Sequence, residues 1–169
     1  NGWPVADCTA EGLSATIAVH HSGFVVPLID EARIKQAIDV ILSYQNSDGG
    51  WATYELTRAP KWLEKLNPSE VFADIMIDYS WTECTAACVI SLLEAQEAYP
   101  DYKNNEIHAA IIAGLKFILG QQKPDGSWYG GWAVCFTYAT WFGVEAISKA
   151  KGKGFYNETV LEGRVNLSE

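Results

Sequence analysis

Apolar residues recur along the chain at the three- and four-residue spacing of helices that bury one face. In residues 31–44, for example, Ile34, Ala37, Ile38 and Ile41 fall on one side of a helical wheel. Segments with Gly or Pro separate such stretches, so the pattern predicts helices joined by turns and irregular connections. The predicted helices cover residues 7–21, 31–44, 83–99, 105–122 and 137–150.

Two segments of the chain are each repeated once. Residues 6–11 read Ala-Asp-Cys-Thr-Ala-Glu, and residues 83–87 read Glu-Cys-Thr-Ala-Ala. Each copy is followed by what we call a Gln–Trp element, which is Gln-Asn-Ser-Asp-Gly-Gly-Trp at residues 45–51 and Gln-Lys-Pro-Asp-Gly-Ser-Trp at residues 122–128. The chain is therefore an array of helical hairpins, each closed by a Gln–Trp element.

Helical hairpins stacked side by side bury their apolar faces only against their neighbours. If the array curls, the first helices form an inner ring around a cavity and the second helices form an outer ring. The predicted fold is all-α, an α/α toroid, present as an incomplete barrel because the repeats end within a third unit. We expect residues 1–150 to belong to this barrel domain and residues 151–169 to be a divergent tail that is not native-like.

We expect the Gln–Trp elements to have a structural role. A Gln amide can satisfy exposed backbone groups at a helix end, and Asp-Gly forms a tight turn. The Trp side chain is large enough to cover the end of a helix in the next unit. These elements are therefore predicted to fasten neighbouring hairpins together.

Composition and charge narrow the possible partners. The chain is 49% apolar and 20% charged, which is typical of a chain that fills a core, and its net charge of −9 argues against nucleic acid as a partner. No apolar run reaches the ~18–20 residues that a membrane span requires. The four cysteines form neither a CxxC pair nor a zinc-type cluster, so we expect no metal and reduced, buried thiols.

Asp7, between Ala6 and Cys8, is the first candidate for chemistry. It could cap the first helix, as could Thr9, or it could act as a Brønsted acid, because apolar surroundings favour the protonated form of a carboxyl group. The repeat predicts that Cys8 and Cys84 occupy equivalent places on neighbouring inner helices, where both thiols could hydrogen-bond the acid without adding positive charge. Glu11, one turn further, could pair or relay protons.

Aromatic residues are the second group of candidates. Most could simply fill the core, yet many lie in irregular or glycine-flanked segments, where their faces could line a cavity and stabilise a cation. An acid beside an aromatic cavity suits a reaction that forms a carbocation and must exclude water. The residues are Trp51, Tyr54, Phe72, Tyr79, Trp81, Trp128, Trp132, Phe136, Tyr138, Trp141 and Phe142.

Residues 5–11 resemble the DCTAE signature of the oxidosqualene cyclases, the lanosterol synthase family, and the Gln–Trp elements resemble the QW repeats of that family. Residues 66–72, 74–79 and 132–138 are also similar to family segments. Squalene–hopene cyclases carry instead an Asp-rich DxDD motif, which suits protonation of a bare alkene. Ala-Asp-Cys therefore favours an epoxide, which is easier to protonate.

The resemblance implies two α/α barrels, of which this chain would be part of the second, catalytic one. Asp7 would protonate the epoxide of 2,3-oxidosqualene to start cyclisation to a lanosterol-type sterol or triterpene, with Cys8 and Cys84 tuning the acid. Tyr54 would match a tyrosine near the final deprotonation. The site residues expected are Asp7, Cys8, Cys84 and Tyr54 for catalysis, and Trp132, Phe72, Trp51 and Tyr138 for substrate binding.

Members of the family are monotopic membrane proteins that take a lipid substrate from the bilayer, at the endoplasmic reticulum or lipid droplets, and they need no metal or organic cofactor. Asn1-Gly-Trp-Pro4 reads like the middle of a longer protein, so we expect a fragment. The first barrel and much of the cavity would then be absent. We expect the isolated chain to be inactive.

Other interpretations stay open. The chain could be a squalene–hopene-type cyclase, or a non-catalytic α/α repeat module that binds a lipid or a protein partner. A glycoside hydrolase of the α/α type is disfavoured because Asp7 and Glu11 lie one turn apart on one helix, which is a poor arrangement for flanking a sugar bond. A chain like the zinc prenyltransferase β subunit lacks an evident Asp/Cys/His ligand set.

Overall fold

The computed structural model describes residues 4–24, 26, 29–70, 74–132 and 134–155. Regular structure in these ranges is helical, apart from one isolated bridge between Gln45 and Trp51. Each predicted helix is confirmed, with ends that differ by at most two residues. The elements are α1 (Ala6–Ser22), α2 (Glu31–Ser43), the short 3-10 helix η1 (Lys61–Leu66), α3 (Thr82–Ala98), α4 (Asn104–Gln121) and α5 (Cys135–Gly152).

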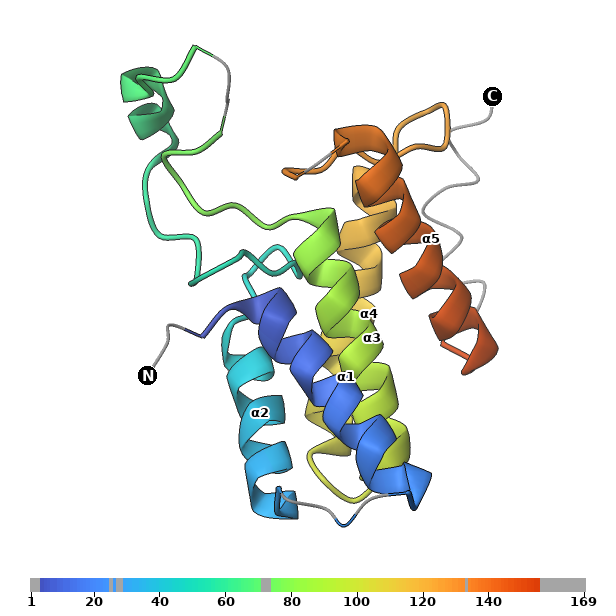
Figure 1. Cartoon of the computed structure of the whole chain (residues 1–169). Coiled ribbons are helices and arrows are strands. Elements are labelled where there is room, and N and C mark those ends of the chain that lie inside the picture. Colours follow the sequence, from blue (N-terminus) through green and yellow to red (C-terminus); the bar gives the residue numbers. More distant parts are fainter. Residues whose placement is uncertain (1–3, 25, 27–28, 71–73, 133, 156–169) are drawn as a thin grey trace.

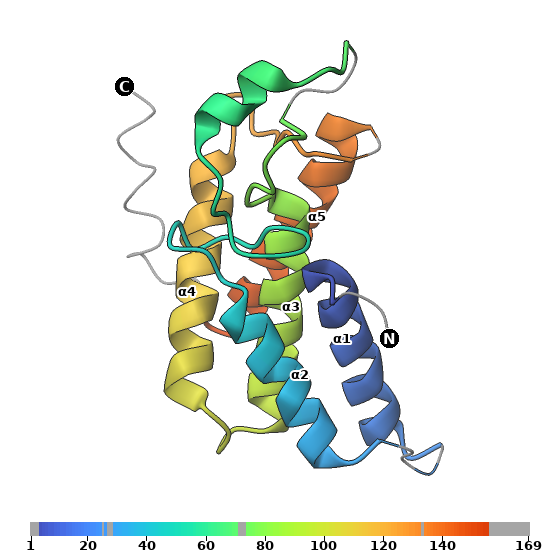
Figure 2. The ribbon, with the colours of Figure 1, turned by 90° about the vertical axis from the view of Figure 1, so that its left-hand side faces the viewer.

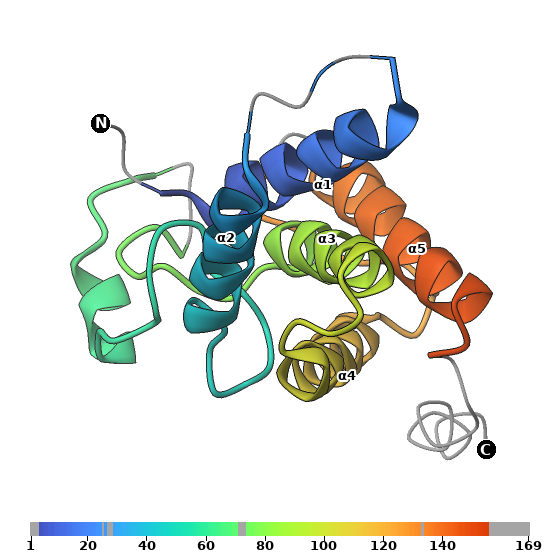
Figure 3. The same ribbon diagram turned by 90° about the horizontal axis from the view of Figure 1, so that it is seen from below.

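The α-helices form two layers, as the α/α prediction requires (Figure 1). The first helices of the units, α1, α3 and α5, run in one direction, and α2 and α4 return in the opposite direction. Viewed from below, α3 lies between the other four helices (Figure 3). Because α3 packs against its neighbours, every residue from Thr82 to Leu93 is buried, and apart from Glu83 these residues are apolar or small.

The first turn of α1 corrects one prediction. Val5 is the N-cap residue and provides no side-chain cap, so neither Asp7 nor Thr9 occupies the N-cap position, although the Asp7 carboxyl accepts the N–H of Cys8 inside the first turn. Instead the backbone N–H of Ala6 donates to Thr53 O at 2.8 Å, which supplies one of the acceptors that a helix start lacks. The cap interpretation was wrong because the partner comes from a distant part of the chain.

Both Gln–Trp elements form the same turn. Gln45 Nε2 donates to Gly49 O at 2.9 Å, and Gln122 Nε2 donates to Gly126 O at 2.7 Å. Both glycines have φ of 88°, in the left-handed region that favours glycine. Gln45 Nε2 also lies 2.9 Å from Ala110 O in α4, so the first element ties the end of α2 to the next hairpin.

Trp51 joins two hairpins through two hydrogen bonds. Its indole Nε1 donates to Ile41 O of α2 at 2.7 Å, and its backbone N donates to the Thr85 hydroxyl of α3 at 3.0 Å. The side chain is fully buried, and its ring lies 3.0 Å from where a Cβ on Gly114 of α4 would stand. The fastening role predicted for this element is therefore confirmed.

Trp128 repeats this arrangement one unit later. Its Nε1 donates to Ile118 O of α4 at 2.6 Å, and its backbone N donates to the Thr140 hydroxyl of α5 at 3.0 Å. A Cβ on Gly143 would stand 2.9 Å from the indole. The same bonds at both joints explain why the two Gln–Trp elements share their sequence.

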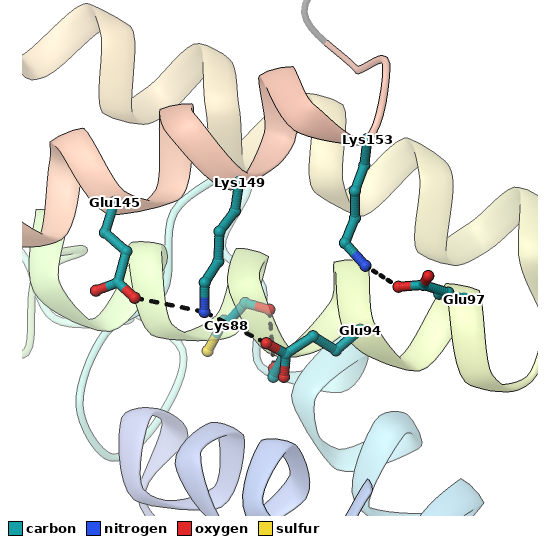
Figure 4. Close-up of polar contacts among 7 residues, drawn as sticks. Cys88, Glu94, Glu97, Glu145, Lys149 and Lys153 are labelled. Atoms are coloured by element: carbon teal, nitrogen blue, oxygen red, sulfur yellow. Dashed lines mark hydrogen bonds and ion pairs between the residues drawn. The ribbon is translucent and has the colours of Figure 1, made fainter. Parts of the chain in front are cut away.

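Ion pairs also join α3 to α5 (Figure 4). Lys149 Nζ lies 3.3 Å from Glu94 Oε1 and 3.4 Å from Glu145 Oε1, and Lys153 pairs with Glu97. Solvent screens the attraction in pairs this exposed, so they add little to the buried contacts.

The segment between Trp51 and α3 is the longest connection, and its described residues are irregular apart from η1. Figure 2 shows it passing over the end of the molecule where α2 finishes and α3 begins. At its end, Trp81 N donates to Trp51 O at 3.0 Å. The segment therefore returns to the first Gln–Trp element before the next hairpin starts.

A matched pair of substitutions separates backbone strain from crowding in the two Gln–Trp elements. Gly49→Ala and Gly126→Ala meet the same positive φ, but a Cβ on Gly49 would stand 2.6 Å from Ala113 O, whereas the nearest atom at Gly126 is 3.8 Å away. We expect a loss of unfolding free energy of about 1–2 kcal/mol for Gly126→Ala and about 2–4 kcal/mol for Gly49→Ala, measured by urea titration.

The control is Gly120→Ala in α4, where a Cβ meets no atom within 4 Å. It should leave stability unchanged or raise it by up to about 1 kcal/mol, since alanine favours helix. Equal losses for Gly49→Ala and Gly126→Ala would show that Ala113 exerts no steric constraint.

Candidate functional site

A cleft of about 570 Å³ lies on the face formed by α1, α3 and α5. Asp7, Cys8 and Glu11 line it from α1, and Tyr138 and other aromatic residues line it from α5. Farther along the helices, Glu94, Glu145 and Lys149 form a charged end. The inner face of the array therefore combines an acid, the Cys8 thiol and aromatic rings, as the sequence predicted for a cavity.

Three aromatic side chains of α5 form one wall of the cleft. Tyr138 and Phe142 pack edge to face with centroids 5.0 Å apart, and Trp141 and Phe142 are 4.9 Å apart. Trp141 is 57% exposed, so the contacts with its neighbours leave much of this side chain accessible. An accessible aromatic face can stabilise a cation through its quadrupole.

Asp7 lies in the first turn of α1 and is partly buried. Its Oδ1 accepts the backbone N–H of Cys8 at 2.7 Å. Its neighbour Ala6 is held on both sides, because the Ala6 N–H donates to Thr53 O at 2.8 Å and the Cys88 thiol donates to Ala6 O at 3.7 Å. The backbone beside the acid is thus anchored to two other segments.

The cysteines near Asp7 have different environments. Cys8 is exposed, and the negative charge of Asp7 raises the pKa of its thiol. Cys84 is fully buried, with Sγ 4.0 Å from the Thr53 hydroxyl, and burial followed by the charge of Asp7 raises its pKa well above the usual range. Both thiols are therefore neutral at physiological pH. They begin adjacent inner helices, as the repeat predicted, but only Cys84 meets the expectation of burial.

Glu83 is a buried acid that the sequence analysis did not select. Glu83 is only 3% exposed. The Trp132 N–H donates to Glu83 Oε1 at 3.4 Å, whereas Glu83 Oε2 has no hydrogen-bond partner among the described residues. Burial raises the pKa of this carboxyl, against the lowering effect of backbone N–H groups. The available signal was its position, since Glu83 occupies the place of Asp7 in the second repeat.

Glycine is required opposite Glu83. A Cβ on Gly130 would stand 1.8 Å from Glu83 Oε1, so the loop after the second Gln–Trp element approaches the carboxyl through a residue without a side chain. Gly131 faces Trp81 in the same way, because a Cβ on Gly131 would stand 3.2 Å from the Trp81 ring. The start of α3 and this loop therefore fit closely together.

The other predicted site residues divide between the cleft and its surroundings. Tyr138 lines the cleft, whereas Tyr54 lines a separate hollow beside Pro4 and Arg58. Trp132 packs against Trp81 at the start of α3, with ring centroids 5.9 Å apart, and it does not line the cleft.

The remaining predicted substrate-binding residues are Trp51 and Phe72. Trp51 is fully buried between hairpins, so it packs and fastens the fold and has no surface with which to contact a substrate. The sequence could not separate these roles because a Trp beside glycines suits either one. Phe72 lies outside the described residues.

The part of the chain that the structure describes holds neither a cluster of metal-ligating side chains nor a membrane-spanning helix. There, no three His, Cys, Asp or Glu side chains gather in a way that could hold a metal ion. None of the helices in the same ranges has both the length and the apolar character needed to cross a bilayer.

Known proteins are similar to almost the whole chain. The family described as the squalene–hopene cyclase C-terminal domain matches residues 4–165. Cycloartenol synthase of Dictyostelium discoideum is 51% identical over 148 residues, which cover 87% of this chain and 21% of that protein. Lanosterol synthase of Mus musculus is 50% identical over 87% of the chain and 20% of that protein, and lanosterol synthase of Pneumocystis carinii is 43% identical over 99% of the chain and 24% of that protein.

The chain thus spans about a fifth of the length of the first two relatives. The similarity covers the acid motif, both Gln–Trp elements and the cleft-lining face of α5, because the family match runs through all of them.

Thiol labelling tests whether Asp7 acts on Cys8. The charge of Asp7 raises the Cys8 pKa, so Asp7→Asn should lower that pKa and increase the thiolate fraction at pH 8. We expect Cys8 in the Asp7→Asn chain to react faster with a maleimide or disulfide reagent, in a Cys135→Ser background. Cys84 and Cys88 should stay unreactive in both chains, since both are buried. An unchanged labelling rate would show that the two groups do not interact.

The stability of Glu83→Gln should depend on pH in a defined direction. The folded-state pKa of Glu83 is raised, so the wild-type chain loses stability as pH rises from the ordinary carboxyl value of about 4.3 through the folded-state value. Gln cannot ionise, and its oxygen can still accept the Trp132 N–H. Urea midpoints should therefore favour Glu83→Gln increasingly from pH 4 to pH 7. A difference independent of pH would contradict a buried, titrating Glu83.

Proposed function

The chain belongs to the squalene–hopene cyclase C-terminal domain family, and we propose that it forms the acid-bearing part of an enzyme that cyclises 2,3-oxidosqualene to a lanosterol- or cycloartenol-type product. The family assignment confirms the resemblance found in the acid motif and the Gln–Trp elements. The observation that carries the proposal is the placement of Asp7 on the same cleft as Tyr138, Trp141 and Phe142.

In the proposed reaction, the Asp7 carboxyl gives its proton to the epoxide oxygen. The adjacent C–O bond then breaks, its electron pair stays on oxygen as a hydroxyl group, and the carbon becomes a cation. Neighbouring double bonds attack in sequence, each forming a ring bond and passing the positive charge onward. Loss of a proton at the end restores a neutral product, so the acid initiates the reaction without being consumed overall.

The surroundings of Asp7 suit this role. The thiols of Cys8 and Cys84 are neutral, so they can hydrogen-bond a carboxylate without adding the positive charge of a salt bridge. Across the cleft, aromatic rings can stabilise the cation while offering no strong nucleophile to trap it.

Three further residues enter the proposal through their match to the family pattern. Tyr54 is proposed near the final deprotonation, and Trp132 and Phe72 are proposed as aromatic residues of the cavity wall. Tyr54 and Trp132 do not line the cleft that holds Asp7, so these roles require the cavity to continue beyond it. Such a continuation is in keeping with a chain that spans about a fifth of its relatives.

We also propose that the enzyme associates with one face of a membrane, at the endoplasmic reticulum or lipid droplets. The supporting argument is chemical. The proposed substrate is a long apolar lipid that partitions into a bilayer, so an enzyme that collects it from the membrane avoids moving it through water.

A chimaera tests the function. This chain replaces the matching 148-residue segment of mouse lanosterol synthase, and conversion of 2,3-oxidosqualene is followed by gas chromatography and mass spectrometry. We expect turnover in the chimaera, and a loss of about 10²–10⁴-fold in kcat for Asp7→Asn with the fold retained, since the amide cannot supply the proton. The isolated chain should give no product.

The control is Glu106→Gln, an exposed acid on α4 away from the cleft, which should keep full activity. Turnover by Asp7→Asn at the rate of the unmodified chimaera would remove Asp7 from the acid role. Product formation by the isolated chain would show that the rest of the relatives' length is not needed.

A further inference from the structure

Asp78 lies in the irregular segment before α3, and its carboxylate binds a stretch of backbone near the acid. Oδ1 accepts the N–H of Thr53 at 3.0 Å. Oδ2 accepts the N–H of Tyr54 at 2.6 Å and that of Glu55 at 3.2 Å. Hydrogen bonds to an ionised acceptor are roughly twice as strong as neutral ones, so one carboxylate holds three consecutive residues in place.

The backbone that Asp78 holds is the one that anchors the start of α1. Thr53 O accepts the N–H of Ala6 at 2.8 Å, directly before Asp7. The hydroxyl of the same Thr53 lies 4.0 Å from Cys84 Sγ, and the residue is 8% exposed. Thr53 therefore contacts both the helix turn that carries the acid and the buried thiol.

Asp78 is itself fixed by the first Gln–Trp element. The Thr57 hydroxyl donates to Asp78 O at 2.6 Å. Asn46 within that element accepts the Thr57 N–H at 2.8 Å and donates to the Thr57 hydroxyl at 3.2 Å. The carboxylate thus has a defined position from which to hold residues 53–55.

We propose that Asp78 is a positioning residue for the acid, which it places through Thr53 and Ala6 without touching Asp7 or the substrate. The inference rests on the proposed function, in which the proton of Asp7 must lie within reach of an epoxide oxygen. Misplacing a reacting group by about 1 Å can cost about 10²-fold in rate. Removing the carboxylate frees three backbone N–H groups and releases Thr53, so the start of α1 shifts.

Kinetics in the mouse chimaera measure the effect on the reaction. Asp78→Ala should lower kcat per folded enzyme about 10- to 100-fold while KM changes by less than about threefold, because alignment of the acid is lost and most substrate contacts remain. Asp78→Asn keeps one acceptor oxygen, so its kcat should lie between that of Asp78→Ala and that of the unmodified chimaera. A kcat within about twofold of the unmodified chimaera would overturn the proposal.

The matched control is Asp125→Ala in the second Gln–Trp element. Asp125 Oδ1 accepts the Ser127 N–H at 3.0 Å and the Ser127 hydroxyl at 2.7 Å, so it also holds a turn, but it does not line the cleft. The Asp125→Ala variant should therefore keep the kcat of the unmodified chimaera. Equal losses for Asp125→Ala and Asp78→Ala would assign both to general loosening and would overturn the positioning role.

Amide hydrogen exchange on the 169-residue chain gives a second readout that needs no activity. In Asp78→Ala the amides of Ala6 and residues 53–55 should lose protection, while Ile111 in the core of α4 stays protected. If Asp78→Ala unfolds, the same comparison is made with Asp78→Asn. Retained protection at Ala6 would overturn the proposal.

The two readouts also separate this inference from the proposed function. An inactive chimaera in which Asp78 is intact would refute the cyclase function, whatever the exchange data show. An active chimaera with unchanged kcat in Asp78→Ala would refute the positioning role alone.

Discussion

Trp51 is buried between two hairpins, and its two N–H groups are bonded to different ones, the indole to Ile41 O in α2 and the backbone to the Thr85 hydroxyl in α3. Leaving such a donor unpaired in the interior costs about 1–3 kcal/mol. The side chain is therefore stable only when both helices stand at the distance that satisfies both donors. This constraint holds α3 in the centre of the array, and the inner face depends on α3.

The acid and the aromatic wall lie on different helices, α1 and α5, and α3 packs against both. The packing of α3 against both helices therefore sets the separation of Asp7 from Trp141 across the cleft. Small buried residues on α3, such as Ala86 and Ala87, allow its neighbours to approach closely. The chemistry proposed for the cleft thus depends on the packing of α3, whose Ala87 and Ile90 also form part of the cleft lining.

The sequence predicted the parts of this structure that depend on local pattern. Helical spacing located the helices, and the two copies of the Gln–Trp element predicted fastened hairpins because each copy repeats the same turn chemistry. Asp7 was placed correctly on the inner layer, but its interpretation as a cap failed because Thr53, a residue far along the chain, provides the acceptor at the helix start. Glu83 and Asp78 were not selected for the same reason, since their partners Trp132 and Thr53 lie 49 and 25 residues away.

The two Trp joints give the array a polarity. Trp51 of the first unit depends on Thr85 of the second, and Trp128 of the second depends on Thr140 of the third, so each unit is completed by the one that follows. The stability of such an array depends on the interfaces between neighbouring units, so the joint at Thr140 helps to hold the helices that place Asp7, more than a hundred positions away.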